Sequence, residues 1–170
     1  MSIDNNLTKA QLLEELAALR QQLENEDARK KLALIQTIEA GLSEQLSLQE
    51  IYDLVGEKLK GYFDATSVVI AIYDQKTNLV QYPYFMDKGT FVDVSPKPVG
   101  NSFSGHVIKT KKTLYFSQQT EILKLVKKLR MDIDDMLHDT ISKSYMGVPL
   151  LSQDQVNGMI SLQNTNREGA

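Results

Sequence analysis

The clearest hydrophobic pattern lies in the last third of the chain, between residues 144 and 163. Side chains of an extended chain point alternately to opposite faces. With that period of two, one face of the first half carries Tyr145, Gly147, Pro149 and Leu151, and the other carries Met146, Val148 and Leu150. Both faces are largely apolar, which predicts a strand covered on both sides.

The polar residues 152–155 separate this strand from a second apolar run, Val156 to Gln163, so the pattern predicts an antiparallel hairpin. Asn157-Gly158 is formally the stronger short-turn signal. A turn there would, however, place the polar residues 152–155 opposite the apolar residues 159–162. We therefore predict the turn at 152–155, with Gly158 inside the second strand, where glycine usually marks a bulge or a close backbone approach.

The amino-terminal pattern is helical. Leucines recur at spacings of four, three and four, which is the seam of a coiled coil: Leu12, Leu16, Leu19 and Leu23. The same phase continues into Glu26 and Lys30, so the seam breaks and resumes shifted through Ala28, Leu32, Ile35 and Leu42. We expect a stagger near residues 25–31 and a parallel homodimer through the four leucines and the following helix. The alternative is that this helix packs on its own sheet.

Between these segments the pattern alternates helices and strands. Ser47 with Glu50 three residues later is a capping box, so a helix should start there and end near Gly61. Strands are predicted at 67–73, 79–85 and 113–117, helices at 104–110 and 121–129, and a loop at 86–99. The predicted organisation is a coiled-coil-like helix at 1–27, a globular domain at 28–167 and a tail at 168–170.

Composition removes several classes of function. The 170 residues are 42% hydrophobic and carry a net charge of −3, so the chain can form a sizeable core but has no general attraction for nucleic acid or anionic membrane. No apolar run approaches the roughly 20 residues of a membrane span, and the polar start lacks a secretory signal. We expect a cytoplasmic protein. Zero cysteine excludes disulfides, thiolate zinc sites and thiol nucleophiles.

Two segments together resemble a known family. The first is the run Lys97 to Ile108, KPVGNSFSGHVI, and the second is the hairpin that contains GVPL at 147–150 and SLQ at 161–163. In this order they resemble the GAF family of small-molecule-binding regulatory domains, over residues 28–167. In that family a glycine-rich segment opens a short helix, a strand follows, and a G-V-P-L strand pairs with one ending in S-L-Q. PAS domains share the general plan, but these segments favour GAF.

The resemblance implies an α+β fold: an antiparallel sheet of five or six strands with helices packed on one face, ligand loops on the other, and a long amino-terminal helix before it. It implies a sensory domain of a bacterial-type signalling protein, not an enzyme, which passes its signal to a kinase or cyclase output domain or partner. The helix that usually closes the family's fold is missing after residue 167, so we expect either a piece of a longer protein or a truncated gene.

The resemblance also narrows the range of possible ligands and activities. Bilin attachment and methionine sulfoxide reduction both need a cysteine, which this sequence lacks. The motif of the cyclic-nucleotide branch, an asparagine-lysine pair followed by phenylalanine and aspartate-glutamate, is not found. The ligand and any cofactor therefore stay unidentified at this stage.

The predicted ligand site lies between the sheet and residues 86–110. Aromatic side chains there could wall a pocket for a planar molecule, and the start of the short helix could contact an anion. The predicted ligand-binding residues are Tyr82, Tyr84, Phe85, Ser102, Phe103, Ser104, His106 and Tyr115. The alternatives are that the aromatic residues are plain core and that Gly100 and Gly105 only form a turn.

Other polar groups give no recognisable catalytic or metal pattern. The acidic group Asp132, Asp134, Asp135, His138 and Asp139 fits neither an EF-hand nor a zinc motif, so we interpret it as a solvated loop and predict no metal site. The basic run Lys124, Lys127, Lys128 and Arg130 lies on an amphipathic helix, which favours charge pairing over nucleic acid binding. The leading hypothesis is a small-molecule sensor. The alternative is a structural dimerisation module whose pocket is filled by its own side chains.

Overall fold

The computed structural model of the chain describes residues 9–43, 46–131 and 142–169. The chain divides into two compact units, residues 1–44 and residues 45–170. Within the described residues no helix is long and apolar enough to cross a membrane.

The first unit is built on one uninterrupted helix, α1 (Lys9–Ser43), of 35 residues. The polar stretch at 25–31, where the sequence pattern changes phase and where we placed the domain boundary, does not interrupt it. Two exposed ion pairs span one helical turn there, Glu26 to Lys30 at 2.9 Å and Asp27 to Lys31 at 3.0 Å. Pairs at this spacing support a helix, and the first compact unit extends to residue 44.

The second unit begins with α2 (Leu48–Phe63), and its start confirms the predicted capping box. The Glu50 amide donates to the Ser47 hydroxyl at 3.3 Å, and the Ser47 amide donates to the Glu50 carboxylate at 2.7 Å. These bonds satisfy two amides that the first helical turn leaves without partners. At the other end Asp64 adopts a left-handed conformation, and its amide donates to the carbonyl of Lys60.

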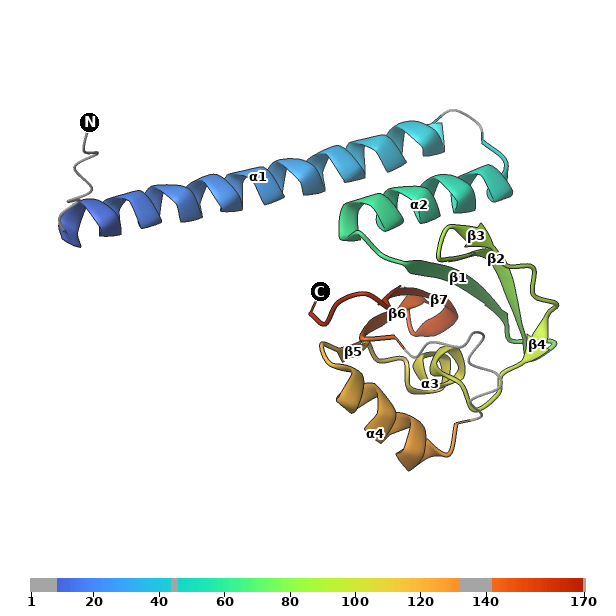
Figure 1. Ribbon diagram of the computed structural model, residues 1–170. Coiled ribbons are helices and arrows are strands. Elements are labelled where there is room, and N and C mark those ends of the chain that lie inside the picture. The colour runs from blue at the N-terminus through green and yellow to red at the C-terminus, as the bar shows by residue number, and fades with distance from the viewer. Residues whose placement is uncertain (1–8, 44–45, 132–141, 170) are drawn as a thin grey trace. The chain divides into compact units, whose positions relative to one another are not determined.

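The sheet is antiparallel and has seven strands, which confirms the α+β class (Figure 1). Its strands are β1 (Ser67–Asp74), β2 (Leu79–Asp87), β3 (Thr90–Phe91), β4 (Lys97–Pro98), β5 (Leu114–Phe116), β6 (Ser144–Ser152) and β7 (Gln155–Asn164). The order is β3-β2-β1-β7-β6-β5, and β4 also pairs with β2. The two short strands β3 and β4 lie within the segment predicted as a loop at 86–99.

The hairpin of β6 and β7 has the predicted register. Ser152 pairs with Gln155 across the turn, and the ladder shifts between Leu150 and Leu151 so that Leu150 faces Gly158 while Leu151 faces Val156. That shift is the predicted bulge. Gly158 also lies so close to the neighbouring strand that an added Cβ would clash with the carbonyl oxygen of Ala71. Both expectations for Gly158, a bulge and a close backbone approach, are confirmed.

Helices cover both faces of the sheet. On one face α2 packs over β1 and β2, and the cluster there is built on Val68, Ile70, Tyr84, Met86 and Leu162. On the other face lie α3 (Phe103–Thr110) and α4 (Gln119–Leu129). There α3 covers β6 and β7, while α4 covers β5 and β6. The face predicted to carry only ligand loops thus carries two helices as well.

A pair of glycine substitutions tests this account of the sheet. Gly158→Ala should destabilise the protein by about 2 to 3 kcal/mol, because the new methyl group must displace backbone rather than a flexible side chain. Gly61→Ala in α2, where an added Cβ meets nothing within 4 Å, should stabilise by about 0.5 kcal/mol through helix propensity. Urea unfolding followed by circular dichroism measures both. Equal stability of the two variants would contradict the register.

Candidate functional site

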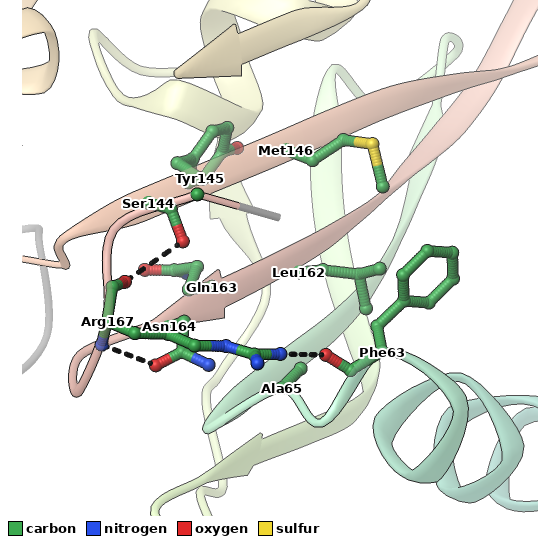
Figure 2. A pocket seen from close by; sticks show the side chains of 10 residues that line it. Phe63, Ala65, Ser144, Tyr145, Met146, Leu162, Gln163, Asn164 and Arg167 are labelled. Carbon is green, nitrogen blue, oxygen red and sulfur yellow. Dashed lines mark hydrogen bonds between the residues drawn. The ribbon is translucent and has the colours of Figure 1, made fainter. Parts of the chain in front are cut away.

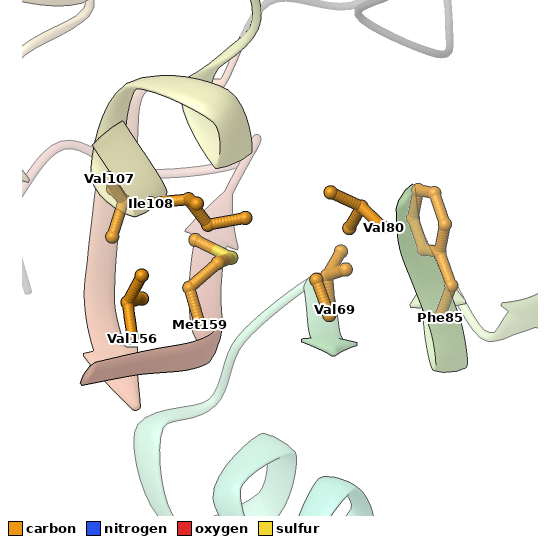
Figure 3. Close-up of a cluster of buried hydrophobic side chains, with 8 residues drawn as sticks. Val69, Val80, Phe85, Val107, Ile108, Val156 and Met159 are labelled. Carbon is orange, nitrogen blue, oxygen red and sulfur yellow. The ribbon is translucent and has the colours of Figure 1, made fainter. Parts of the chain in front are cut away.

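The space between the sheet and α3, where the ligand was predicted, holds a cluster of buried apolar side chains (Figure 3). Val107 and Ile108 of α3 point toward Val156 and Met159 of β7, with Val69 of β1 beside them. Val107 and Met159 are fully buried, and Ile108 is 3% exposed. In this arrangement the protein's own side chains occupy that part of the predicted pocket.

The predicted aromatic residues do not form one wall. Tyr82 and Phe85 pack on the α3 side, whereas Tyr84 is buried in the cluster under α2. The ladder of β1 and β2 shifts between Ile70 and Ile72, so that Ile72 pairs with Gln81 and Ile70 with Tyr84. This irregularity turns Tyr82 and Tyr84 to opposite faces, although residues two apart in a regular strand share a face.

Tyr84 instead joins the sheet to α2. Its hydroxyl donates to the carboxylate of Glu57 at 2.9 Å. Burial, and then the bond to Glu57, raise the pKa of the Tyr84 phenol well above its ordinary value of 10.0. Tyr84 and Tyr82, both predicted to bind the ligand, therefore lie on opposite faces of the sheet.

Tyr115 is also separated from the other predicted site residues. It pairs with Met146, which packs on the α2 side of the sheet, and its side chain is 51% exposed. Phe103 is buried on the opposite face, against Ile122 and Val126 of α4. The structure therefore brings Tyr82, Phe85 and Phe103 to the α3 face and leaves Tyr84 and Tyr115 on the other.

The start of α3 is a tightly hydrogen-bonded turn. The Ser102 hydroxyl caps the helix by accepting from the Gly105 amide at 3.2 Å. An added Cβ at Gly105 would clash with the carbonyl oxygen of Gly100, which also accepts from Lys109 Nζ at 3.0 Å. This close approach explains the glycine at position 105 structurally. Ser102, Ser104 and His106 are partly buried here, and their contact with an anion stays a prediction.

The α3 face contains a polar group that the sequence analysis missed. Tyr145 is 3% exposed, its ring lies 4.7 Å from that of Phe103, and its hydroxyl lies over Gly147, where an added Cβ would be 2.7 Å away. Its hydroxyl bonds to Ser161, which pairs with Gly147 across the hairpin, and Tyr82 is close enough to act on it electrostatically. We refer to Tyr82, Tyr145 and Ser161 as the tyrosine-serine group.

The environment keeps the Tyr145 phenol neutral. Burial raises its pKa far above the ordinary 10.0, the hydrogen bond with Ser161 acts in the opposite direction, and Tyr82 adds to the rise. A neutral phenol can donate or accept a hydrogen bond but is a poor general base near pH 7. The sequence signal for this group is that two small residues, Gly147 and Ser161, face each other in the predicted register of the hairpin.

Comparison with known proteins decides the family. A model of the GAF domain family matches residues 47–169. The chain belongs to the GAF family. A comparison with curated proteins finds no match. GAF domains are regulatory folds found in signalling proteins, although some proteins with this fold are enzymes.

Solved structures agree on the fold. The GAF domain of a phosphoenolpyruvate-protein phosphotransferase from Acinetobacter is 16% identical, with a TM-score of 0.64 over 82% of this chain and 80% of that one. The free methionine-R-sulfoxide reductase of Neisseria meningitidis, solved with its substrate, is 16% identical, with a TM-score of 0.62 over 85% and 77%. The A. aeolicus nlh2 GAF domain is 15% identical, with a TM-score of 0.59 over 84% and 83%.

The carboxy-terminal residues Arg167 and Gly169 line a small cavity together with Phe63 and residues of β6 and β7 (Figure 2). Arg167 donates from its guanidinium to the Phe63 carbonyl at 3.2 Å and from its amide to the Asn164 side chain at 3.1 Å. The cavity holds about 30 Å³, which is room for a water molecule rather than a ligand. The Gly169 amide also donates a hydrogen bond to the Ser117 carbonyl at 2.8 Å.

The structure describes residues 9–43, 46–131 and 142–169. Among them, no three acidic or histidine side chains are grouped so that they could hold a metal ion. The acidic group from Asp132 to Asp139 lies outside the described residues.

A double-mutant cycle tests the hydrogen bond between Tyr145 and Ser161. Tyr145→Phe and Ser161→Ala should each destabilise the domain by about 1 kcal/mol, because each removes one buried hydrogen bond. The double variant should cost less than the sum, since both single changes break the same bond. Urea unfolding measures the cycle, and Tyr115→Phe, at an exposed tyrosine, should change nothing. Strict additivity of the two changes would show that the two hydroxyls do not interact.

Proposed function

We propose that this GAF protein is a dimeric regulatory module whose amino-terminal helix pairs with the same helix of a second copy and carries signals to an output partner such as a kinase or cyclase. The observation that carries the proposal is the exposure of large apolar side chains along α1. Leu19 is 52% exposed, Leu23 73%, Leu32 55% and Ile35 52%. A helix with such side chains on its surface gains stability when a second helix buries them.

The geometry of α1 divides these side chains between two surfaces. Leu19 and Leu23 are four residues apart and share one side of the helix, whereas Leu32 follows Leu23 by nine residues, or about two and a half turns. Leu32 and Ile35 therefore lie on roughly the opposite side. Because α1 is continuous, one partner helix cannot cover both surfaces. We assign the contact between copies to the seam of Leu12, Leu16, Leu19 and Leu23.

The packing on the α3 face supports signalling that needs no ligand. Side chains of Val69, Val107, Ile108 and Met159 fill the space where the ligand was predicted, and each is at most 5% exposed. A module of this kind responds when its partners shift the helix arrangement. This favours the dimerisation module over the sensor.

One observation keeps small-molecule sensing as a second candidate. The tyrosine-serine group places hydroxyl groups among the apolar side chains of the α3 face. Binding sites commonly combine apolar walls with a few such polar groups. A ligand there would have to displace the Tyr145 ring from its place over Gly147.

Native mass spectrometry of the full chain tests the leading proposal. The wild type should be a dimer, and Leu19→Gln/Leu23→Gln should weaken dimerisation at least ~100-fold, because burial of each leucine stabilises by about 1.5 to 3 kcal/mol. Leu32→Gln/Ile35→Gln is the matched control and should stay dimeric, since glutamine preserves helix propensity in both variants.

Three results of that experiment would change the proposal. A monomeric wild type would overturn the dimer, and dissociation by the Leu32/Ile35 variant alone would move the contact to the opposite side of α1. A discrete added mass that is retained by wild type and lost in Ser161→Ala would establish the second candidate, the sensor.

A further inference from the structure

A second hollow lies at one end of the sheet, where no ligand was predicted. It is an open cleft with a volume of about 510 Å³. Its main lining residues are Lys60 from the last turn of α2, Lys88 and Gly89 from the turn between β2 and β3, and Thr66, Thr165 and Asn166 from the ends of β1 and β7. A volume between about 300 and 1,000 Å³ is typical of small-molecule sites.

The charge of this cleft is opposite to that of the chain. Two lysines line it and no carboxylate does, although the chain as a whole carries a net charge of −3. Asp87 adjoins Lys88 in the sequence but does not line the cleft. The Asp64 carboxylate lies 3.6 Å from the guanidinium of Arg167. Hydroxyl and amide groups of Thr165 and Asn166 complete a lining that suits an anion with further polar groups.

Hydrogen bonds hold the walls of the cleft in place, and Thr66 is at their centre. Its hydroxyl donates to the Gln163 carbonyl at 3.2 Å and accepts from the Thr165 amide at 3.0 Å. Its carbonyl accepts from the Lys88 amide at 2.8 Å. The three segments that carry the cationic and polar side chains are therefore fixed to one another, which reduces the ordering that binding requires.

The turn between β2 and β3 further fixes the position of Lys88. Lys88 has a φ of 46° and Gly89 a φ of 83°. Positive φ at both central residues is the pattern of a type I′ hairpin turn, in which asparagine is the usual first residue. Lysine at that place is less favoured by the backbone than asparagine would be.

We propose that this cleft binds a small phosphorylated molecule, with the phosphate at Lys60 and Lys88 and the rest of the molecule along Thr165 and Asn166. Two lysines match the roughly two negative charges of a phosphate monoester, and lysine is a common point-charge partner of phosphate. The cleft is larger than a phosphate ion needs, so the ligand includes a polar organic part. This site is independent of the proposed dimer through α1, and either can fail without the other.

Isothermal titration calorimetry of the 170-residue chain with glucose 6-phosphate tests the site. The variant Lys60→Gln/Lys88→Asn should bind at least tenfold more weakly, and its fold should be retained because asparagine tolerates positive φ. The matched control is Lys111→Asn/Lys124→Gln, which also replaces one lysine of positive φ and one helical lysine. Its affinity should stay within twofold of wild type.

Several outcomes overturn the proposal. Absence of binding by wild type, or equal weakening in the two double variants, would show that no specific anion site exists. Equal affinity for malonate, a dicarboxylate, would overturn the assignment to phosphate. Equal affinity for neutral glucose would overturn the role of the lysines. Backbone amide shifts of Thr66, Lys88 and Gly89 on titration should locate the bound molecule at the cleft, and shifts confined to α3 would place it elsewhere.

Discussion

The close approach of the β7 backbone to β1 at Gly158 is the constraint on which the rest of the sheet depends. β7 lies at the centre, paired with β1 on one side and β6 on the other. Because Gly158 has no side chain to keep the Ala71 carbonyl away, the bulge beside it sets which residues of β7 face each layer. Ile160 and Leu162 then face the α2 layer, and Met159 and Ser161 face the α3 layer. One backbone contact thus positions both cores.

This alternation has a functional consequence on the α3 face. Ser161 comes to lie opposite Gly147, and the space above Gly147 receives the Tyr145 hydroxyl. The apolar cluster of Val107, Ile108 and Met159 lies on the same face, and the ring of Phe103 packs against the ring of Tyr145. The part of a GAF domain expected to hold a ligand is here packed with the protein's own residues, which is why the proposed function rests on α1 and not on a pocket.

Much of the fold could be predicted from the sequence, because its signals are local. The capping box at Ser47 and the hairpin turn at 152–155 depend on neighbouring residues, and both are confirmed. The aromatic wall was not predicted correctly, since the irregularity opposite Ile70 and Ile72 reverses the face of Tyr84. Its signal in the sequence is Pro83, because proline inside a strand marks an edge or a bulge. The tyrosine-serine group and the lysine cleft escaped for another reason: their members come from distant segments that only the sheet register brings together.

For α1, the sequence pattern and the structure together locate the surface that a partner helix would cover. The leucine spacing predicted a seam that changes phase, and the continuous helix places the two parts of that seam on different sides. Exposure of Leu19 and Leu23 then identifies an unburied surface. The 170 residues contain no cysteine, so a single introduced cysteine reports its neighbours without interference.

The most direct test of the proposed parallel dimer is therefore disulfide cross-linking of the 170-residue chain that carries Leu23→Cys. Mild oxidation should yield a covalent dimer on a non-reducing gel, because equivalent residues of a parallel seam face each other, whereas Leu32→Cys should remain uncross-linked under the same conditions. Efficient cross-linking at position 32 with none at position 23 would contradict the account.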